Sequence, residues 1–229
     1  MKKTAKLIAL AAVLFAGFGP GNANAEGFKI GADVVSSYVW RGSELDNSVN
    51  VQPALSYTFK NGLAISAWGS YGLSEDNGER YKEVDLTVSM PVGPVTLAVT
   101  DYNNDPGNDN PDNGGLFDFR EDGANTVEVS ASYSKDNVGL MAGVFVAGND
   151  YKNAVYCEAS YQFYNKDGYT AKAVAGVGSE DYYGDFEGDG SDKFALVNTG
   201  ISVAKDRFTA SAIYNPDKEA SSLVFMASF

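Results

Sequence analysis

Side chains of opposite character alternate along most of this 229-residue chain. Around residue 55, for example, Val51, Leu55 and Tyr57 lie on one side of an extended chain, whereas Gln52 and Ser56 lie on the other. A period of two places successive side chains on opposite faces of a β-strand. The pattern recurs in about 12 segments, so the sequence predicts an all-β fold. These segments are 28–40, 49–59, 63–73, 82–90, 93–102, 124–134, 137–147, 152–164, 169–179, 193–204, 207–214 and 220–229.

The links between these segments alternate in length. The short links are 60–62, 92–94, 135–137, 165–168 and 205–207, and the long ones are 41–48, 74–80, 103–123, 148–152, 180–192 and 215–219. Short periplasmic turns alternating with long extracellular loops, with an even number of strands about ten residues long, are typical of bacterial outer-membrane barrels. The sequence therefore predicts a transmembrane antiparallel up-and-down β-barrel of about 12 strands.

The first 25 residues have the features of a signal peptide. Lys2, Lys3 and Lys6 precede the apolar run 7–18, and a small-x-small cleavage pattern ends at Ala25. The apolar run is too short to span a bilayer. We therefore predict a signal peptide over 1–25, a single barrel domain over 26–229, and export to the cell outer membrane of a Gram-negative bacterium.

The last segment, SSLVFMASF, alternates up to an aromatic residue at position 229. If this strand closes the barrel against the first strand, Leu223 and Phe225 face lipid and Phe229 lies at the membrane interface. In the soluble alternative, Phe229 caps a core strand. Many further aromatic residues lie near segment ends, which favours two interfacial girdles over ordinary strand propensity. They are Tyr38, Trp40, Tyr57, Phe59, Tyr71, Tyr133, Tyr161, Phe163, Tyr169, Phe194, Phe208 and Tyr214.

Charge and composition exclude several functions. The net charge is −13, and it becomes −16 when the leader removes three lysines and no acidic residue, which argues against nucleic-acid binding. The absence of histidine excludes Ser-His and Cys-His nucleophiles and His-ligated metal sites. No GxSxG stretch is present, so we predict no enzyme activity, cofactor or metal. Cys157 is expected to be a small buried or lipid-facing residue.

The polar faces of the strands would line the lumen. Most of these positions are small or hydroxylated, and the charged ones that we predict to line a pore are Asp33, Arg41, Glu83, Asp85, Glu128, Glu158 and Lys172. An excess of carboxylates attracts cations, which predicts a narrow, mildly cation-preferring pore for small hydrophilic solutes or ions. In the alternative, these charges pair across strands, with Arg41 or Lys172 bridging acids, and only tie the wall together.

Two acidic loops are candidate binding or blocking segments. The link 101–123 contains GLFDF at 115–119, which could fold into the lumen as a plug or remain a solvated loop. Residues 185–190 match the first half of a calcium loop, but Leu196 stands where its bidentate Glu is expected. Both loops could collect divalent ions that bridge to lipopolysaccharide; alternatively they only keep the outer surface solvated.

The stretch GADVVSSYVWRG at 31–42 resembles the N-terminal signature of the TorF-like porin family. NVQPALSYTFKNGLAISAWGSYGL at 50–73 is similar to that family's second and third strands, whereas Ser43 and Glu44 replace a Gln that often follows its Arg-Gly pair. The resemblance implies an outer-membrane barrel with a porin role and carries no substrate. The terminal aromatic strand also resembles the signal read by the outer-membrane assembly machinery, which would act through Phe229. A non-conducting structural or adhesive barrel, acting through its acidic extracellular loops, is the alternative.

Overall fold

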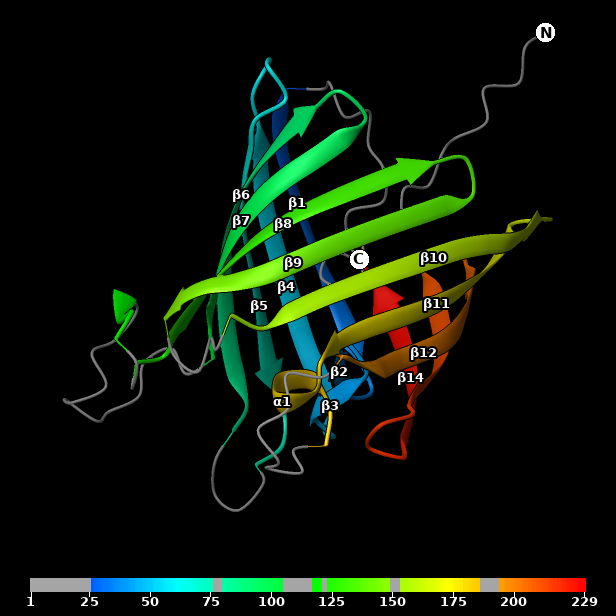
Figure 1. Ribbon diagram of the computed structural model, residues 1–229. Coiled ribbons are helices and arrows are strands. Elements are labelled where there is room, and N and C mark those ends of the chain that lie inside the picture. Colours follow the sequence, from blue (N-terminus) through cyan, green and yellow to red (C-terminus); the bar gives the residue numbers. More distant parts are fainter. Residues whose placement is uncertain (1–25, 76–79, 105–116, 121–122, 149–152, 186–193) are drawn as a thin grey trace, which may run out of the picture.

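The fold is a closed barrel of 12 antiparallel strands, as the sequence predicts (Figure 1). The computed structural model describes residues 26–75, 80–104, 117–120, 123–148, 153–185 and 194–229. The barrel strands are β1 (Gly27–Val35), β4 (Asn50–Thr58), β5 (Ala64–Gly72), β6 (Lys82–Val92), β7 (Val95–Asn103), β8 (Asn125–Lys135), β9 (Val138–Gly148), β10 (Val155–Lys166), β11 (Tyr169–Ser179), β12 (Phe194–Lys205), β13 (Phe208–Asn215) and β14 (Ala220–Ser228). The remaining elements are β2 (Tyr38–Trp40), β3 (Ser43–Asp46) and the short helix α1 (Glu180–Tyr183).

The first and last barrel strands close the sheet. Asp33 lies opposite Ser228 in the register between β1 and β14. The N–H of Phe229 donates to the carbonyl of Ala32 at 2.9 Å, and the N–H of Ala32 donates back to Phe229 at 3.2 Å. Closure pairs the outer edges of both strands, so no edge of the barrel sheet is left open.

The connections lie at opposite ends according to their length. Five tight links join β4–β5, β6–β7, β8–β9, β10–β11 and β12–β13 at one end, here named the short-turn end. The link after β10 has Asp167 and Gly168 at φ 55° and 79°, the backbone of a primed hairpin turn. The longer links emerge at the other end, here named the long-loop end (Figure 1). The predicted alternation of short and long links is therefore confirmed.

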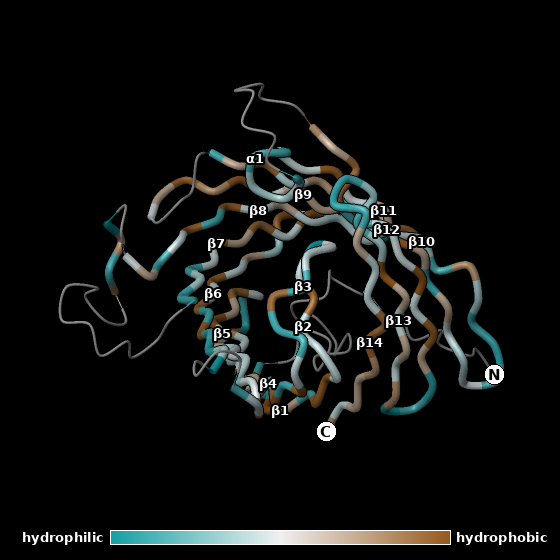
Figure 2. Tube along the Cα trace, turned by 90° about the horizontal axis from the view of Figure 1, so that it is seen from below, coloured by the Kyte–Doolittle hydropathy of each residue, from teal (hydrophilic) through white to brown (hydrophobic). Residues whose placement is uncertain are grey.

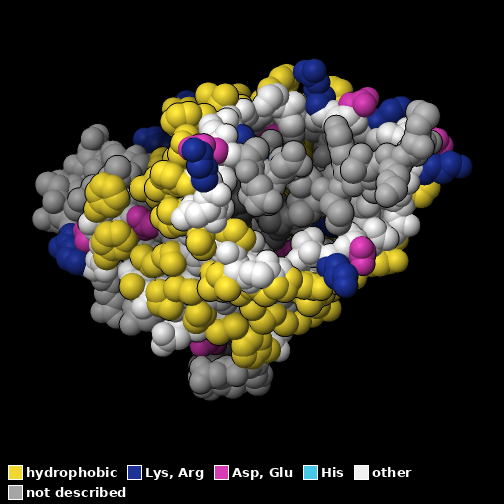
Figure 3. Space-filling view, turned by 90° about the horizontal axis from the view of Figure 1, so that it is seen from above, with side chains coloured by type: hydrophobic (Ala, Val, Ile, Leu, Met, Phe, Trp, Pro, Cys, Tyr) yellow, Lys and Arg dark blue, Asp and Glu magenta, His cyan; other side chains and the backbone are white. Residues whose placement is uncertain are grey.

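The outer wall is apolar and the inner wall is polar. Phe28, Ile30 and Leu223 are each more than 60% exposed on the outside, whereas Asn50 and Gln52 are buried on the inside. Figure 3 shows hydrophobic side chains gathered along the outside of the wall. This arrangement is the reverse of a water-soluble core. No helix among the described residues is long and apolar enough to cross a membrane.

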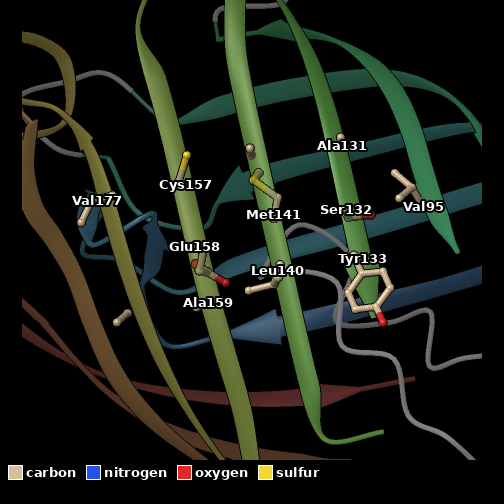
Figure 4. Close-up of a pocket in the computed structure, with 12 residues that line it drawn as sticks. Val95, Ala131, Ser132, Tyr133, Leu140, Met141, Cys157, Glu158, Ala159 and Val177 are labelled. Carbon is tan, nitrogen blue, oxygen red and sulfur yellow. The ribbon is translucent and has the colours of Figure 1, made fainter. Parts of the chain in front are cut away.

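Cys157 points outward, between the inward-facing Tyr156 and Glu158. It lines a shallow outer hollow of about 500 Å³ over β7 to β11, where small residues such as Ala131 and Ala159 lie beside Tyr133 and Leu140 (Figure 4). The thiol is thus one of several small groups on the outer wall.

The structure corrects the start of the barrel. The prediction that residues 28–40 form one wall strand, followed by an external loop over 41–48, is wrong: β1 ends at Val35. The chain then turns inward, and β2 and β3 form a separate hairpin that lies inside the ring of barrel strands (Figure 2). Tyr38, Val39 and Trp40 are consecutive and all at most 9% exposed. A wall strand exposes every second side chain, so burial on both faces marks this segment as internal.

Candidate functional site in the barrel lumen

A hairpin inside the barrel carries the charged group at the centre of the lumen. We name residues 38–46, which comprise β2, β3 and their turn, the plug hairpin. Its two turn residues, Arg41 and Gly42, have φ values of 50° and 85°. Positive φ at both positions defines the tight turn that matches strand twist, and it is uncommon for arginine. A side chain at position 42 would meet the Val197 backbone of β12, so glycine allows the turn to rest against the wall.

The tip of the plug hairpin is joined to the wall by a buried ion pair. The Arg41 guanidinium donates two hydrogen bonds to the Glu128 carboxylate of β8, at 2.6 and 2.9 Å. It also donates to the hydroxyl of Tyr183 in α1 at 2.7 Å. The two charged side chains are only 4% and 2% exposed. A bidentate pair with an extra hydrogen bond is among the strong charge-assisted contacts in proteins.

The environment keeps Arg41 charged. Burial opposes the charge, but the Glu128 carboxylate, together with Tyr102 and Tyr183, outweighs burial and raises the pKa of Arg41 well above its usual value. Glu128 reaches the guanidinium because position 143 on β9 is glycine. A Cβ there would lie 2.6 Å from the Glu128 carboxyl carbon.

Aromatic rings fill the lumen around the plug hairpin. The Trp40 ring lies 5.8 Å from Tyr102 and 5.6 Å from Tyr183, and Tyr38 lies 5.5 Å from Trp68. The Arg41 guanidinium lies 4.5 Å from the centre of the Trp40 ring, a cation–π contact. We name the following set the aromatic cluster: Tyr38, Trp40, Trp68, Tyr102, Phe145, Tyr156 and Tyr183. All seven are buried and form one apolar core.

Three inward carboxyl groups lie near this level without a cationic partner. On β6, Glu83 accepts a hydrogen bond from the Tyr81 hydroxyl at 2.8 Å, and Asp85 has one buried oxygen that receives no hydrogen bond. On β1, one oxygen of Asp33 is likewise buried and without a hydrogen bond. Within the described ranges, none of the three forms an ion pair. They give this part of the lumen an excess of acidic groups.

A cavity of about 460 Å³, lined by both polar and apolar side chains, occupies the lumen between the plug hairpin and the short-turn end. Val39 and Arg41 line its deep part, and turn residues such as Asp136 and Asp206 line its mouth. Figure 3 views this end and shows a hollow at its centre. Glu158 and Lys172 line the wall of the same cavity. The lumen therefore has a level at the hairpin that is filled by buried side chains, here named the dry level, and an open cavity beyond it.

The seven predicted pore-lining residues divide between these levels. Arg41 and Glu128 pair with each other, so the alternative of mutually bridged charges is realised for that pair. Lys172 forms no ion pair with an acid among the described residues. Asp33, Glu83, Asp85 and Glu158 are buried on the inner wall. Whether any of the seven lines a conducting path stays a prediction.

One sequence-based assignment of aromatic residues is wrong. Tyr38 and Trp40 are not girdle residues, because they lie in the aromatic cluster. For the GLFDF stretch, the exposure of Phe117 and Phe119, 63% and 46%, favours the solvated loop over the plug. The sequence gives no signal for the role of Tyr183, because a helix of four residues is too short to show a periodic pattern.

The other predicted girdle residues lie on the outer wall or at its ends, where their side chains are partly or largely exposed. Residues 105–116, and most of the calcium-like stretch 185–190, lie outside the described residues.

Comparisons with known proteins find similarity at the level of the barrel. No family model matches the chain. No curated protein matches it either. A solved structure from work on asymmetric conductivity of engineered proteins is similar over 89% of this chain and 100% of its own, at 11% identity and a TM-score of 0.36. A Salmonella typhi OmpF complex with daunomycin is similar over 92% of this chain and 99% of its own, at 9% identity and a TM-score of 0.35.

Proposed function

We propose that this protein is an outer-membrane channel for passive diffusion of small hydrophilic solutes or ions, with the plug hairpin as its constriction. The open cavity of about 460 Å³, with charged and hydroxyl side chains in its lining and a wall that is apolar outside, is the observation that carries this proposal. A 12-stranded barrel is wider than the eight-stranded ones that side chains alone can fill, so water has room in the cavity between the hairpin and the short-turn end. The leader 1–25 would direct export, and Phe229 would be read by the assembly machinery.

The channel is expected to prefer cations mildly. Arg41 is neutralised by Glu128, whereas Glu83 and Asp85 have no cationic partner among the described residues. Fixed negative charge in a narrow, low-dielectric passage raises the local cation concentration and repels anions. The acidic loops at the long-loop end would face lipopolysaccharide.

A non-conducting structural barrel is the second candidate. It is favoured by the aromatic cluster and the Arg41–Glu128 pair, which together cross the lumen. The two candidates differ in what the purified full-length protein does in a planar bilayer. Stepwise currents with a reversal potential of cation-selective sign support the channel. Silence of the wild type, together with silence of a variant lacking the plug hairpin, would refute it.

A further inference from the structure

Several charged groups line the lumen cavity, and two of them, the ammonium of Lys172 and the carboxyl group of Glu158, form no ion pair with each other. Lys172 lies on β11 and Glu158 lies on β10. In the register of these strands, Glu158 lies opposite Gly176 and Lys172 lies opposite Gln162. Their backbone positions are therefore offset by four residues, which corresponds to about 13 Å along the strands. The two charged groups interact through space, but they make no ion pair in the described part of the chain.

The carboxyl group is fixed in place by its neighbours. One oxygen of Glu158 accepts hydrogen bonds from the Tyr156 hydroxyl at 2.8 Å and from the Asn198 amide at 3.2 Å. The Tyr156 ring fits there because position 176 is glycine, where a Cβ would overlap the tyrosine hydroxyl. The other oxygen of Glu158 receives no hydrogen bond from a described residue. A rigid carboxylate with a free oxygen is a prepared acceptor for a cationic group.

The ammonium group is surrounded by neutral polar side chains. Lys172 lies between Gln162 of β10 and Ser202 of β12 in the strand register, and it makes no hydrogen bond to a described residue. Arg41 also lines the cavity, but both of its terminal nitrogens are engaged with Glu128. The deep cavity thus offers one positive and one negative charge to a solute, together with hydroxyl and amide groups.

We propose that this cavity binds a small zwitterion, whose carboxylate contacts Lys172 and whose ammonium contacts Glu158. A short apolar substituent would rest against Val39, Val174 and Val224, which line the same cavity. A simple anion or cation would leave the opposite charge of the protein desolvated without a partner, whereas a zwitterion satisfies both. The volume of about 460 Å³ lies within the usual range of small-molecule pockets. The proposal builds on the channel function by naming its solute class, but binding itself does not require conduction.

Three probes with one hydrocarbon skeleton test the charge requirement. L-leucine carries both charges, 4-methylpentanoate lacks the ammonium, and 3-methylbutylamine lacks the carboxylate. Calorimetric titration of the full chain in detergent is expected to give leucine an affinity at least about tenfold higher than either analogue. Equal binding of all three probes, or no leucine binding up to about 10 mM, would overturn the proposal.

Variants then assign each charge to its residue. Lys172→Gln is expected to remove the preference for leucine over 3-methylbutylamine, and Glu158→Gln the preference over 4-methylpentanoate. Lys60→Gln is the matched control, because its side chain is 84% exposed on a turn outside the cavity, and its leucine affinity is expected to stay within about twofold of wild type. If Lys172→Gln still prefers leucine over 3-methylbutylamine, Lys172 does not contact the carboxylate of the solute. If the protein binds leucine but both the wild type and the variant lacking the plug hairpin are silent in bilayers, the channel is overturned and this site still stands. A conducting protein without leucine binding does the reverse.

Discussion

Two levels of the same lumen differ sharply in character. At the plug hairpin, large aromatic side chains and a bidentate ion pair leave no side chain of the aromatic cluster more than 9% exposed. Toward the short-turn end, serine, threonine and glutamine surround a cavity of about 460 Å³. Single strands contribute to both levels: β10 provides Tyr156 to the cluster, and Ser160 and Gln162 to the cavity. The comparison shows that the plug hairpin and the large inward side chains around it, rather than the number of strands, decide where the lumen narrows.

Removing the plug hairpin is expected to have the largest effect on this contrast. Val35 pairs with Asn50, so a Gly-Ser linker of about four residues in place of 37–47 spans β1 and β4 as an ordinary hairpin loop. Without Trp40 and Arg41, the side chains that fill the middle of the lumen at the dry level are gone. Single-channel conductance is therefore expected to rise by about an order of magnitude. Planar-bilayer recording measures this. A variant with wild-type conductance would show that the lumen is closed elsewhere.

Breaking the ion pair from one side is the next largest change. Glu128→Gln leaves the buried Arg41 charge without a counter-charge, and this is expected to lower the free energy of unfolding by about 3–5 kcal/mol. Urea unfolding in lipid vesicles, followed by tryptophan fluorescence, measures the loss. Replacing both partners with apolar residues, as in Arg41→Met with Glu128→Leu, is expected to restore most of it, since no unpaired charge remains.

A surface pair provides the control for that experiment. The Lys60 Nζ atom lies 3.6 Å from Glu26 Oε2, and the Lys60 side chain is 84% exposed. Lys60→Gln is therefore expected to lower the free energy of unfolding by about 0–1 kcal/mol. If Glu128→Gln lowers the free energy of unfolding no more than this control does, the buried ion pair does not hold the plug hairpin in place. The difference between the two levels would then not depend on that ion pair.

Crowding the ion pair, without removing it, is expected to have a smaller effect. Gly143→Ala places a Cβ against the Glu128 carboxyl, which must shift away from Arg41, at an expected cost of about 1–3 kcal/mol. The same unfolding assay measures this cost. In a Glu128→Ala background the added methyl group meets no carboxylate, so the further cost is expected to fall below about 0.5 kcal/mol. An equal cost in both backgrounds would mean that alanine disturbs the strand and not the pair.

The wall of the barrel was predictable from sequence, and the plug hairpin was not. Alternation and turn residues are local signals, so the strand order, the short and long links and the outward position of Phe225 could be predicted from neighbouring residues. The hairpin depends on contacts between distant residues: Arg41 meets Glu128 and Tyr183, which are 87 and 142 positions away. Its first residues follow directly on the alternating run that begins at residue 28, and burial on both faces is what distinguishes them from a wall strand. The carboxyl and ammonium side chains were found from sequence because they fall on the polar face of wall strands, but which of them pair depends on the hairpin.

The smallest expected effect tests which level selects ions. Glu83→Gln with Asp85→Asn removes two acidic groups that have no cationic partner among the described residues, so the cation-to-anion permeability ratio is expected to fall by about twofold. Glu158→Gln with Lys172→Gln removes one charge of each sign from the wider cavity, and the ratio is expected to stay close to wild type. Reversal potentials under a potassium chloride gradient measure both. The narrow plug level concentrates the electric field of its fixed charges, whereas water in the wider cavity screens the charges there. Equal shifts of the reversal potential in the two double variants would therefore show that the plug level does not control permeation.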